Sequence, residues 1–302
     1  MWLELEIFGF RALWSPYFMV FVISLAVAYF LITGPFRHKF SGGERPTVKQ
    51  QIMFYSAIVL LYAVKGGPTD LLSHIMLTAH MIQMAIFFLV FPILVIKGIP
   101  EWIWRKVLYA PIIKPVVKLL TKPIISLLLF NGLFSFYHIP AVFNFAKSSQ
   151  LAHTSISLII LFAAFMVWMP VLAPIKELDR MRPLVKIFYI FANGVLLTPA
   201  CALIIFADKP LFATYTQDGA WLQALALCVP GDVLDGLAVQ ISGPEMFSPM
   251  SILEDQQLGG IIMKVMQEIT YGIILGRVFF KWFSDESVKK IDPVPAELQH
   301  TQ

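Results

Sequence analysis

Histidine and methionine side chains occur together in the stretch LLSHIMLTAHMIQM, residues 71–84, which opens a long apolar segment. Imidazole nitrogens bind copper and zinc, whereas a thioether sulfur specifically favours Cu(I). An imidazole without a partner is costly in hydrocarbon, so these side chains either contact neighbouring helices or bind a ligand. On one continuous helix, His80 and Met84 would lie one turn apart on nearly the same face, and His74 about 9 Å from His80 along the axis. The spacing therefore indicates that His80 and Met84 can share a ligand.

The composition is that of an integral membrane protein. Of the 302 residues, 58% are hydrophobic and 14% are charged, whereas soluble domains have about 45–50% and about 25%. Glu4 and Glu6 stand where a cleavable signal peptide carries basic residues, so we expect the first apolar segment to be retained. Cys201 and Cys228 are too few for a disulfide-rich scaffold or a four-thiolate metal site, and the sequence leaves open whether they pair.

Seven stretches are long and apolar enough to cross a bilayer as helices of about 20 residues. The spans are expected at about 15–33, 49–65, 71–96, 122–140, 153–173, 184–207 and 258–281. They would form one transmembrane domain, residues 1–283, followed by a short cytoplasmic tail, residues 284–302. The expected fold class is all-α, a polytopic membrane protein built as a bundle of seven transmembrane helices.

Basic residues are concentrated on alternate connections. The connections 34–48, 97–121 and 174–183 carry 11 of the 23 lysines and arginines, whereas the connection 208–257 has seven acidic residues and Lys209 as its only basic residue. Because lysine and arginine are enriched on the cytoplasmic side, this asymmetry predicts an outer N-terminus and a cytoplasmic C-terminus.

This orientation places four of the six histidines on the outer side: His74, His80, His138 and His153. Together with Met84, the last three form an N,N,N,S set that suits Cu(I). His74 would lie further out and receive copper first, and Met81 is a secondary candidate on the same helix. Methionine is also a common apolar filler, and histidines in spans can serve as hydrogen-bond contacts between helices. Four histidines gathered on one side of three helices favour the metal site.

The last expected span has two further features. Lys264 and Glu268 are spaced i,i+4, which predicts an ion pair that neutralises both charges in the membrane. Small residues in the same span allow close approach of another helix: Gly259, Gly260, Gly272 and Gly276. The chain has no GxSxG, HExxH or phosphate-binding glycine loop, and no nucleophile–base pair is evident. We therefore do not expect an enzyme.

Long stretches of the chain resemble the CtaG family of cytochrome c oxidase assembly factors, whose genes lie beside those of haem–copper oxidases in Bacillus-like bacteria. The stretches are LLSHIMLTAHMIQM, LFNGLFSFYHIP, FANGVLLTPACALIIFA, WLQALALCVP, SGPE and EDQQLGGIIMK. His80, His138 and His153 match histidine positions of the family. More distant relatives often have an HxxxH pair, and Met84 and Ser157 stand at the second positions of such pairs.

The resemblance implies a multi-pass protein of the bacterial plasma membrane that matures a haem–copper oxidase, most simply by delivering copper to one of its subunits. It adds Asp255 and Met263 as secondary candidate ligands, because they match the family's DQ…M stretch. The implied partners are haem–copper oxidase subunits, other copper chaperones and the lipid bilayer, with no nucleic acid.

Three alternatives remain open on the sequence alone. Histidines on facing helices can ligate haem, as in a membrane electron carrier. A proton- or metal-coupled transporter would use Lys264 and Glu268, although the chain lacks the internal repeats that many transporters have. A structural scaffold for oxidase subunits would use the histidines only as contacts between helices.

Overall fold

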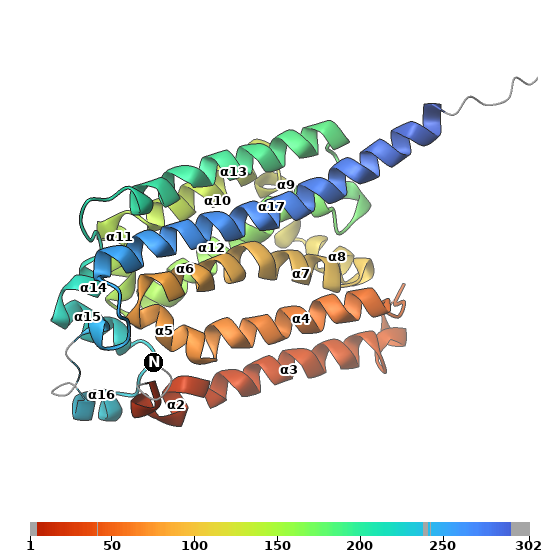
Figure 1. Cartoon of the computed structure of the whole chain (residues 1–302). Helices are drawn as coiled ribbons and strands as arrows, with labels where there is room; N and C mark the ends of the chain where they lie inside the picture. The colour runs from red at the N-terminus through yellow and green to blue at the C-terminus, as the bar shows by residue number, and fades with distance from the viewer. Residues whose placement is uncertain (1–4, 41, 238–240, 242, 291–302) are drawn as a thin grey trace, which may run out of the picture.

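All regular secondary structure in the part of the chain that the computed structural model describes is helical. That part comprises residues 5–40, 42–237, 241 and 243–290. Long helices lie side by side in an elongated bundle (Figure 1). The prediction of an all-α fold is therefore confirmed.

The long helices of the bundle are α3 (Pro16–Thr33), α4 (Val48–Lys65), α6 (Leu77–Ala85) with the π-helical turn η3 (Ile86–Val90) and α7 (Phe91–Gly98), α10 (Pro123–Tyr137), α12 (Gln150–Leu172), α13 (Pro183–Ile205) and α17 (Ile252–Lys290). The shorter helices are α2 (Gly9–Trp14), α5 (Pro68–Ile75), α8 (Glu101–Leu108), α9 (Ile113–Leu120), α11 (Pro140–Lys147), α14 (Ala213–Thr216), α15 (Asp218–Leu225) and α16 (Gly231–Leu237). Single 3₁₀ turns lie at Glu6–Phe8, Arg37–Lys39, Lys176–Leu178 and Pro244–Met246.

Five helical segments among the described residues are long and apolar enough to cross a membrane. They are Glu6–Thr33, Leu77–Gly98, Gln150–Leu172, Pro183–Ile205 and Ile252–Glu286. The number rises to seven if each of two bent pairs is one span: α4 with α5, bent by 43°, and α9 with α10, bent by 87°. The chain is thus a membrane protein with five to seven candidate spans.

One expected span differs from the structure. The apolar run 71–96 is not one helix, because Met76 adopts an extended conformation (φ −137°, ψ 146°) between α5 and α6. The angular relation between His74 and His80 that a continuous helix would give is therefore wrong. At the other end of the chain, α17 continues past residue 283 to Lys290, and residues 291–302 of the expected tail lie outside the described part.

Local sequence signals explain where several helices begin. Thr47 and Gln50 form a capping box at the start of α4, with Gln50 N–H donating to Thr47 Oγ1 at 3.2 Å and Thr47 N–H donating to Gln50 Oε1 at 2.9 Å. Ser149 caps α12 by accepting from the N–H of Ala152 at 3.2 Å. Proline occupies a first-turn position in α3, α5, α10 and α13, where its missing N–H costs nothing.

Two glycines near the start of α17 let this helix pack closely against α6 and α13. A Cβ on Gly259 would lie 3.1 Å from Thr78 Cα in α6, and one on Gly260 would lie 2.8 Å from Ile205 Cγ1 in α13. The expected close approach is confirmed at these two positions. Gly272 and Gly276 differ, since no other described helix lies within 4 Å of a Cβ built there.

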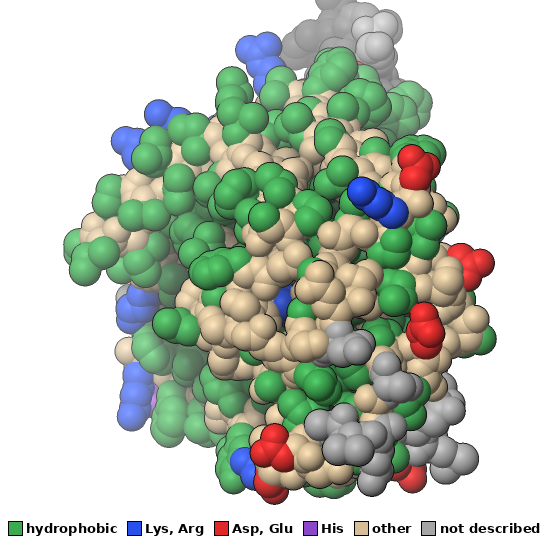
Figure 2. Space-filling model, turned by 90° about the vertical axis from the view of Figure 1, so that its left-hand side faces the viewer, with side chains coloured by type: hydrophobic (Ala, Val, Ile, Leu, Met, Phe, Trp, Pro, Cys, Tyr) green, Lys and Arg blue, Asp and Glu red, His purple; other side chains and the backbone are tan. Residues whose placement is uncertain are grey.

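The two ends of the bundle carry different connections. The short helices α5, α11, α14, α15 and α16 lie at one end, and α8 and α9 lie at the other (Figure 1). We call the end with α5 and α11 the histidine end. Seen end-on in Figure 2, its surface is mainly hydrophobic and uncharged, with acidic side chains along one side.

Candidate functional site

Four histidines from four different segments converge at the histidine end. His74 lies in α5, His80 in α6, His138 directly after α10, and His153 in the first turn of α12. All four are buried, with exposed fractions of 1%, 1%, 0% and 8%. Burial of four imidazoles in one region is the arrangement that the sequence predicted, although the contacts between them differ from those expected.

The histidines form two neighbouring groups. His74 and His153 contact each other directly, with ring centroids 5.5 Å apart at an interplanar angle of 63°. His80 and His138 lie on either side of Tyr137, whose ring centroid is 6.0 Å from His80 and 5.1 Å from His138. His153 was expected beside His80, and the structure instead pairs it with His74.

Two of the imidazoles have one nitrogen engaged and the other free. His74 Nδ1 lies 2.8 Å from the carbonyl oxygen of Asp70, and His138 Nδ1 lies 2.7 Å from that of Phe134. With N–H on Nδ1, the lone pair of each ring is on Nε2, and neither Nε2 has a hydrogen-bond partner in the described part of the chain. Metal-ligating histidines commonly donate the other ring N–H to a backbone carbonyl in this way.

The other two histidines also have buried nitrogens without partners. Both ring nitrogens of His80 and Nδ1 of His153 make no hydrogen bond to any residue that the structure describes. His80 lies against aromatic rings, including that of Phe143 at 5.2 Å. A buried polar atom without a partner costs roughly 1–3 kcal/mol, so this region carries a stability cost that a ligand would relieve.

No set of three or more histidine, cysteine, aspartate or glutamate side chains among the described residues is close enough to hold one metal ion. Among the described histidines, the rings in direct contact are those of His74 and His153. Met84 follows His80 by one turn of α6, and both lie on the same continuous helix. The methionines Met81, Met84 and Met263 are all buried in the apolar core, where methionine also serves as filler.

Asp255 has a different role from that of a metal ligand. Its Oδ2 accepts from the N–H of Leu77 at 2.6 Å and its Oδ1 from the N–H of Thr78 at 3.2 Å, while Thr78 Oγ1 donates to its backbone oxygen at 2.8 Å. Asp255 therefore caps α6 from another helix, at the break between His74 and His80. Its negative charge also complements the positive end of the α6 dipole.

Replacing Asp255 by alanine is expected to destabilise the protein by roughly 2–4 kcal/mol, because the buried N–H groups of Leu77 and Thr78 would lose a charged acceptor. Thermal unfolding in detergent measures the effect. The control is Glu254→Ala, which removes an exposed contact to Ser251 at the start of α17 and is expected to cost less than about 1 kcal/mol. Equal losses in the two variants would contradict the capping role.

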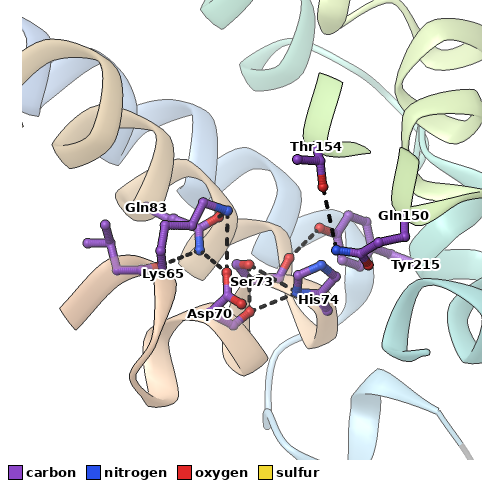
Figure 3. Close-up of polar contacts among 9 residues, drawn as sticks. Lys65, Asp70, Ser73, His74, Gln83, Gln150, Thr154 and Tyr215 are labelled. Atoms are coloured by element: carbon purple, nitrogen blue, oxygen red, sulfur yellow. Dashed lines mark hydrogen bonds and ion pairs between the residues drawn. The ribbon is translucent and has the colours of Figure 1, made fainter. Parts of the chain in front are cut away.

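A polar network ties α4, α5 and α6 together beside His74 (Figure 3). Lys65 Nζ lies 3.3 Å from Asp70 Oδ1, and Gln83 Nε2 donates to the same oxygen at 2.7 Å. From the loop side, Tyr215 OH donates to the backbone oxygen of Ser73 at 3.0 Å. These contacts fix α5, and with it His74, although the sequence shows only two isolated charges and a glutamine here.

Lys147 is the last residue of α11, in the connection between α10 and α12. It is only 1% exposed, and its amine has no hydrogen-bond partner among the described residues. Burial lowers the pKa of Lys147 from 10.5 to about 7. Its charge lies near enough to act on His74, His80 and His153. No motif in the sequence marks it, because a lone lysine between two spans normally faces water.

The structure also describes the predicted ion pair of Lys264 with Glu268 and the two cysteines. Lys264 Nζ lies 2.7 Å from Glu268 Oε1 and donates to Thr198 Oγ1 at 2.9 Å, so the expected ion pair is confirmed. Cys201 and Cys228 are both free thiols, one buried and one half-buried.

The fold and the site together define a polytopic helical membrane protein with a buried histidine cluster at one end of its bundle. A family model for the cytochrome c oxidase caa3 assembly factor, Caa3_CtaG, matches residues 27–285, which is most of the chain. No curated protein and no solved structure matches the chain. The chain belongs to the family of cytochrome c oxidase caa3 assembly factors, which confirms the predicted resemblance.

Proposed function

We propose that this member of the family handles copper: it binds Cu(I) at the histidine end and delivers it to a subunit of a haem–copper oxidase. The proposed ligands are His74, His80, Met84, His138 and His153. The observation that carries the proposal is the geometry of His74 and His138, whose Nε2 lone pairs are buried and free while Nδ1 contacts a backbone carbonyl. The protein would carry copper without turnover chemistry.

The donor types fit such a cargo. Imidazole and thioether donors suit Cu(I), and pairs of donors from separate segments can release the ion more easily than a closed cage. Asp255 is occupied as a cap, so the proposed site has no carboxylate ligand. A site without anionic ligands also favours a monovalent cation, because burying net charge is costly.

Two alternative functions have less support. His74 and His153 are in direct ring contact, so no flat macrocycle fits between them as it would between axial ligands of haem. The ion pair of Lys264 and Glu268 neutralises both groups, which gives a coupled transporter no free charge at that position. The scaffold remains the competing function, because no three-donor metal group is present among the described residues.

Deletion of the gene is expected to abolish haem–copper oxidase activity in membranes while the oxidase subunits are still synthesised. Immunoblots of the subunits and oxygen consumption measure the two parts. A copper-free quinol oxidase of the bd type in the same cells is the control and should keep its activity. Equal loss in both oxidases would contradict a copper role.

The proposal includes a bacterial plasma-membrane location and seven spans, with the N-terminus and the histidine end outside. In a chain with both native cysteines replaced by alanine, a cysteine at Asp232 should react with an impermeant thiol reagent in intact cells. A cysteine at Lys106, at the other end of the bundle, should react only after the cells are opened. Both positions are exposed in the structure, so burial does not bias the comparison. The reverse labelling pattern would overturn the orientation.

A further inference from the structure

A cavity of about 450 Å³ lies between α3, α4, α5, the η3–α7 segment and α12. Ligand pockets for small molecules have volumes of about 300–1,000 Å³. One part of the wall is polar: Lys65, Asp70, His74, Gln150, His153, Thr154 and Ser157. The other lining side chains are apolar and include the aromatic rings of Phe18, Phe21, Phe87 and Phe91. The cavity thus has the two-part lining of a site for an amphiphile.

The lining also shows how a ligand would enter. Phe21 in α3 and Leu158 in α12 both line the cavity and are 50% and 56% exposed. Both lie in candidate membrane spans, where exposed apolar side chains face lipid. The cavity therefore opens sideways to the bilayer, and its ligand must be soluble in lipid.

The polar part determines the chemistry of the head group. Lys65 and Asp70 form an ion pair with each other, and Gln83 contacts both, so neither offers an unpaired charge. A phosphate or carboxylate head would find no free cation among the cavity's lysines. The other polar side chains of the wall include three uncharged ones on α12: Gln150, Thr154 and Ser157. Hydroxyl and amide groups donate hydrogen bonds, which suits an uncharged oxygen.

We propose that this cavity binds a lipid-soluble quinone, with a ring oxygen hydrogen-bonded to the hydroxyls of Thr154 and Ser157 and the prenyl chain leaving between α3 and α12. The oxygens of a quinone accept hydrogen bonds and those of a quinol also donate them, and a hydroxyl group can do either. The phenylalanine rings of the wall provide faces for packing against a flat ring. The inference rests on the cavity and on polar side chains of α12 that are not among the proposed copper ligands, so it holds whether or not the protein binds copper.

Leu161→Trp tests the proposal by filling the cavity with an apolar side chain. Ile159→Trp is the matched control, because Ile159 lies in the same helix, is 52% exposed and is not part of the cavity wall. Each protein is purified in a chelator, and the retained quinone is extracted and quantified against phospholipid. We expect Leu161→Trp to lower quinone retention about tenfold, equivalent to roughly 1.4 kcal/mol, and Ile159→Trp to leave it unchanged. Equal quinone content in all three proteins, or retention of phospholipid alone, would overturn the proposal.

A second measurement uses the unmodified chain and therefore does not depend on the folding of a variant. A photoreactive quinone is added to wild-type protein in detergent, and the labelled peptides are identified by mass spectrometry. Labelling confined to peptides that contain Phe87–Phe91 and His153–Leu161, and competed by unlabelled quinone, would support the site. Labelling spread over exposed apolar helices such as α13 would contradict it.

Discussion

Alanine at His80 or His138 is expected to remove most of the copper that the purified protein retains. Removal of an outer-shell partner of a metal ligand lowers metal affinity by ~10–100-fold. Removal of the ligand itself should lower the copper affinity at least as much. Met84→Leu should have a milder effect, because a thioether is a weaker ligand than imidazole. His74→Ala is expected to slow loading more than it lowers final occupancy. Metal analysis after loading with Cu(I), together with oxidase activity in membranes, measures the series.

His38→Ala is the control for this series, because His38 is exposed and follows α3, whose C-terminal end lies away from the histidine end (Figure 1). His80→Phe separates metal binding from packing. The phenyl ring can fill the space beside Tyr137 and Phe143, and it removes two buried nitrogens that have no partner. We expect it to lose copper while stability is maintained or raised. Full copper and full oxidase activity in His80→Ala and His138→Ala would mean that the histidines only hold helices together.

Lys147→Met is expected to stabilise the protein by on the order of 3–5 kcal/mol at neutral pH. In the folded protein the pKa of Lys147 is about 7, whereas an unfolded lysine has a pKa of about 10.4. Between these values the unfolded chain binds more protons, so wild-type stability rises with pH across this window. Below pH 7 the cost of burying Lys147 is fully present. The gain from methionine should therefore be largest at or below pH 7 and vanish above about pH 10.

Thermal unfolding in detergent at pH 6.5 and pH 9.5 measures the effect of Lys147→Met. Lys209→Met is the control, since Lys209 is exposed at the same end of the bundle, and its effect should stay within about 0.5 kcal/mol at both pH values. A Lys147→Met gain that does not depend on pH, or a loss of stability, would show that Lys147 has a partner that stabilises its charge.

The sequence predicted those features of the fold that depend on residues close together in the chain. Hydrophobic length predicted the bounds of α4, α10, α12 and α13 to within three residues, and the i,i+4 spacing predicted the pair of Lys264 and Glu268. The break at Met76 was not predictable, because apolar residues continue through it. Its cause is Asp255, which is 178 residues from Leu77 in the chain and satisfies the free N–H groups of α6.

The same distinction applies to the site. Residue type and charge asymmetry were enough to place four histidines at one end of the bundle. Which of them are neighbours depends on how α5 and α12 meet, and this requires long-range packing. Lys147 was missed for the same reason, since only the covering helices show that it is buried. Likewise, Gly259 and Gly260 contact other helices whereas Gly272 and Gly276 do not, although all four follow the same local pattern.

X-ray absorption at the copper edge of Cu(I)-loaded wild-type protein tests the copper proposal most directly, because it reports whether copper binds and which atoms hold it. The proposal predicts that copper is retained, with imidazole nitrogen as the main scatterer and at most one sulfur per site. Cys201→Ala with Cys228→Ala should leave the spectrum unchanged. Copper that washes out during purification, or a spectrum dominated by sulfur that disappears in the cysteine variant, would contradict a histidine site.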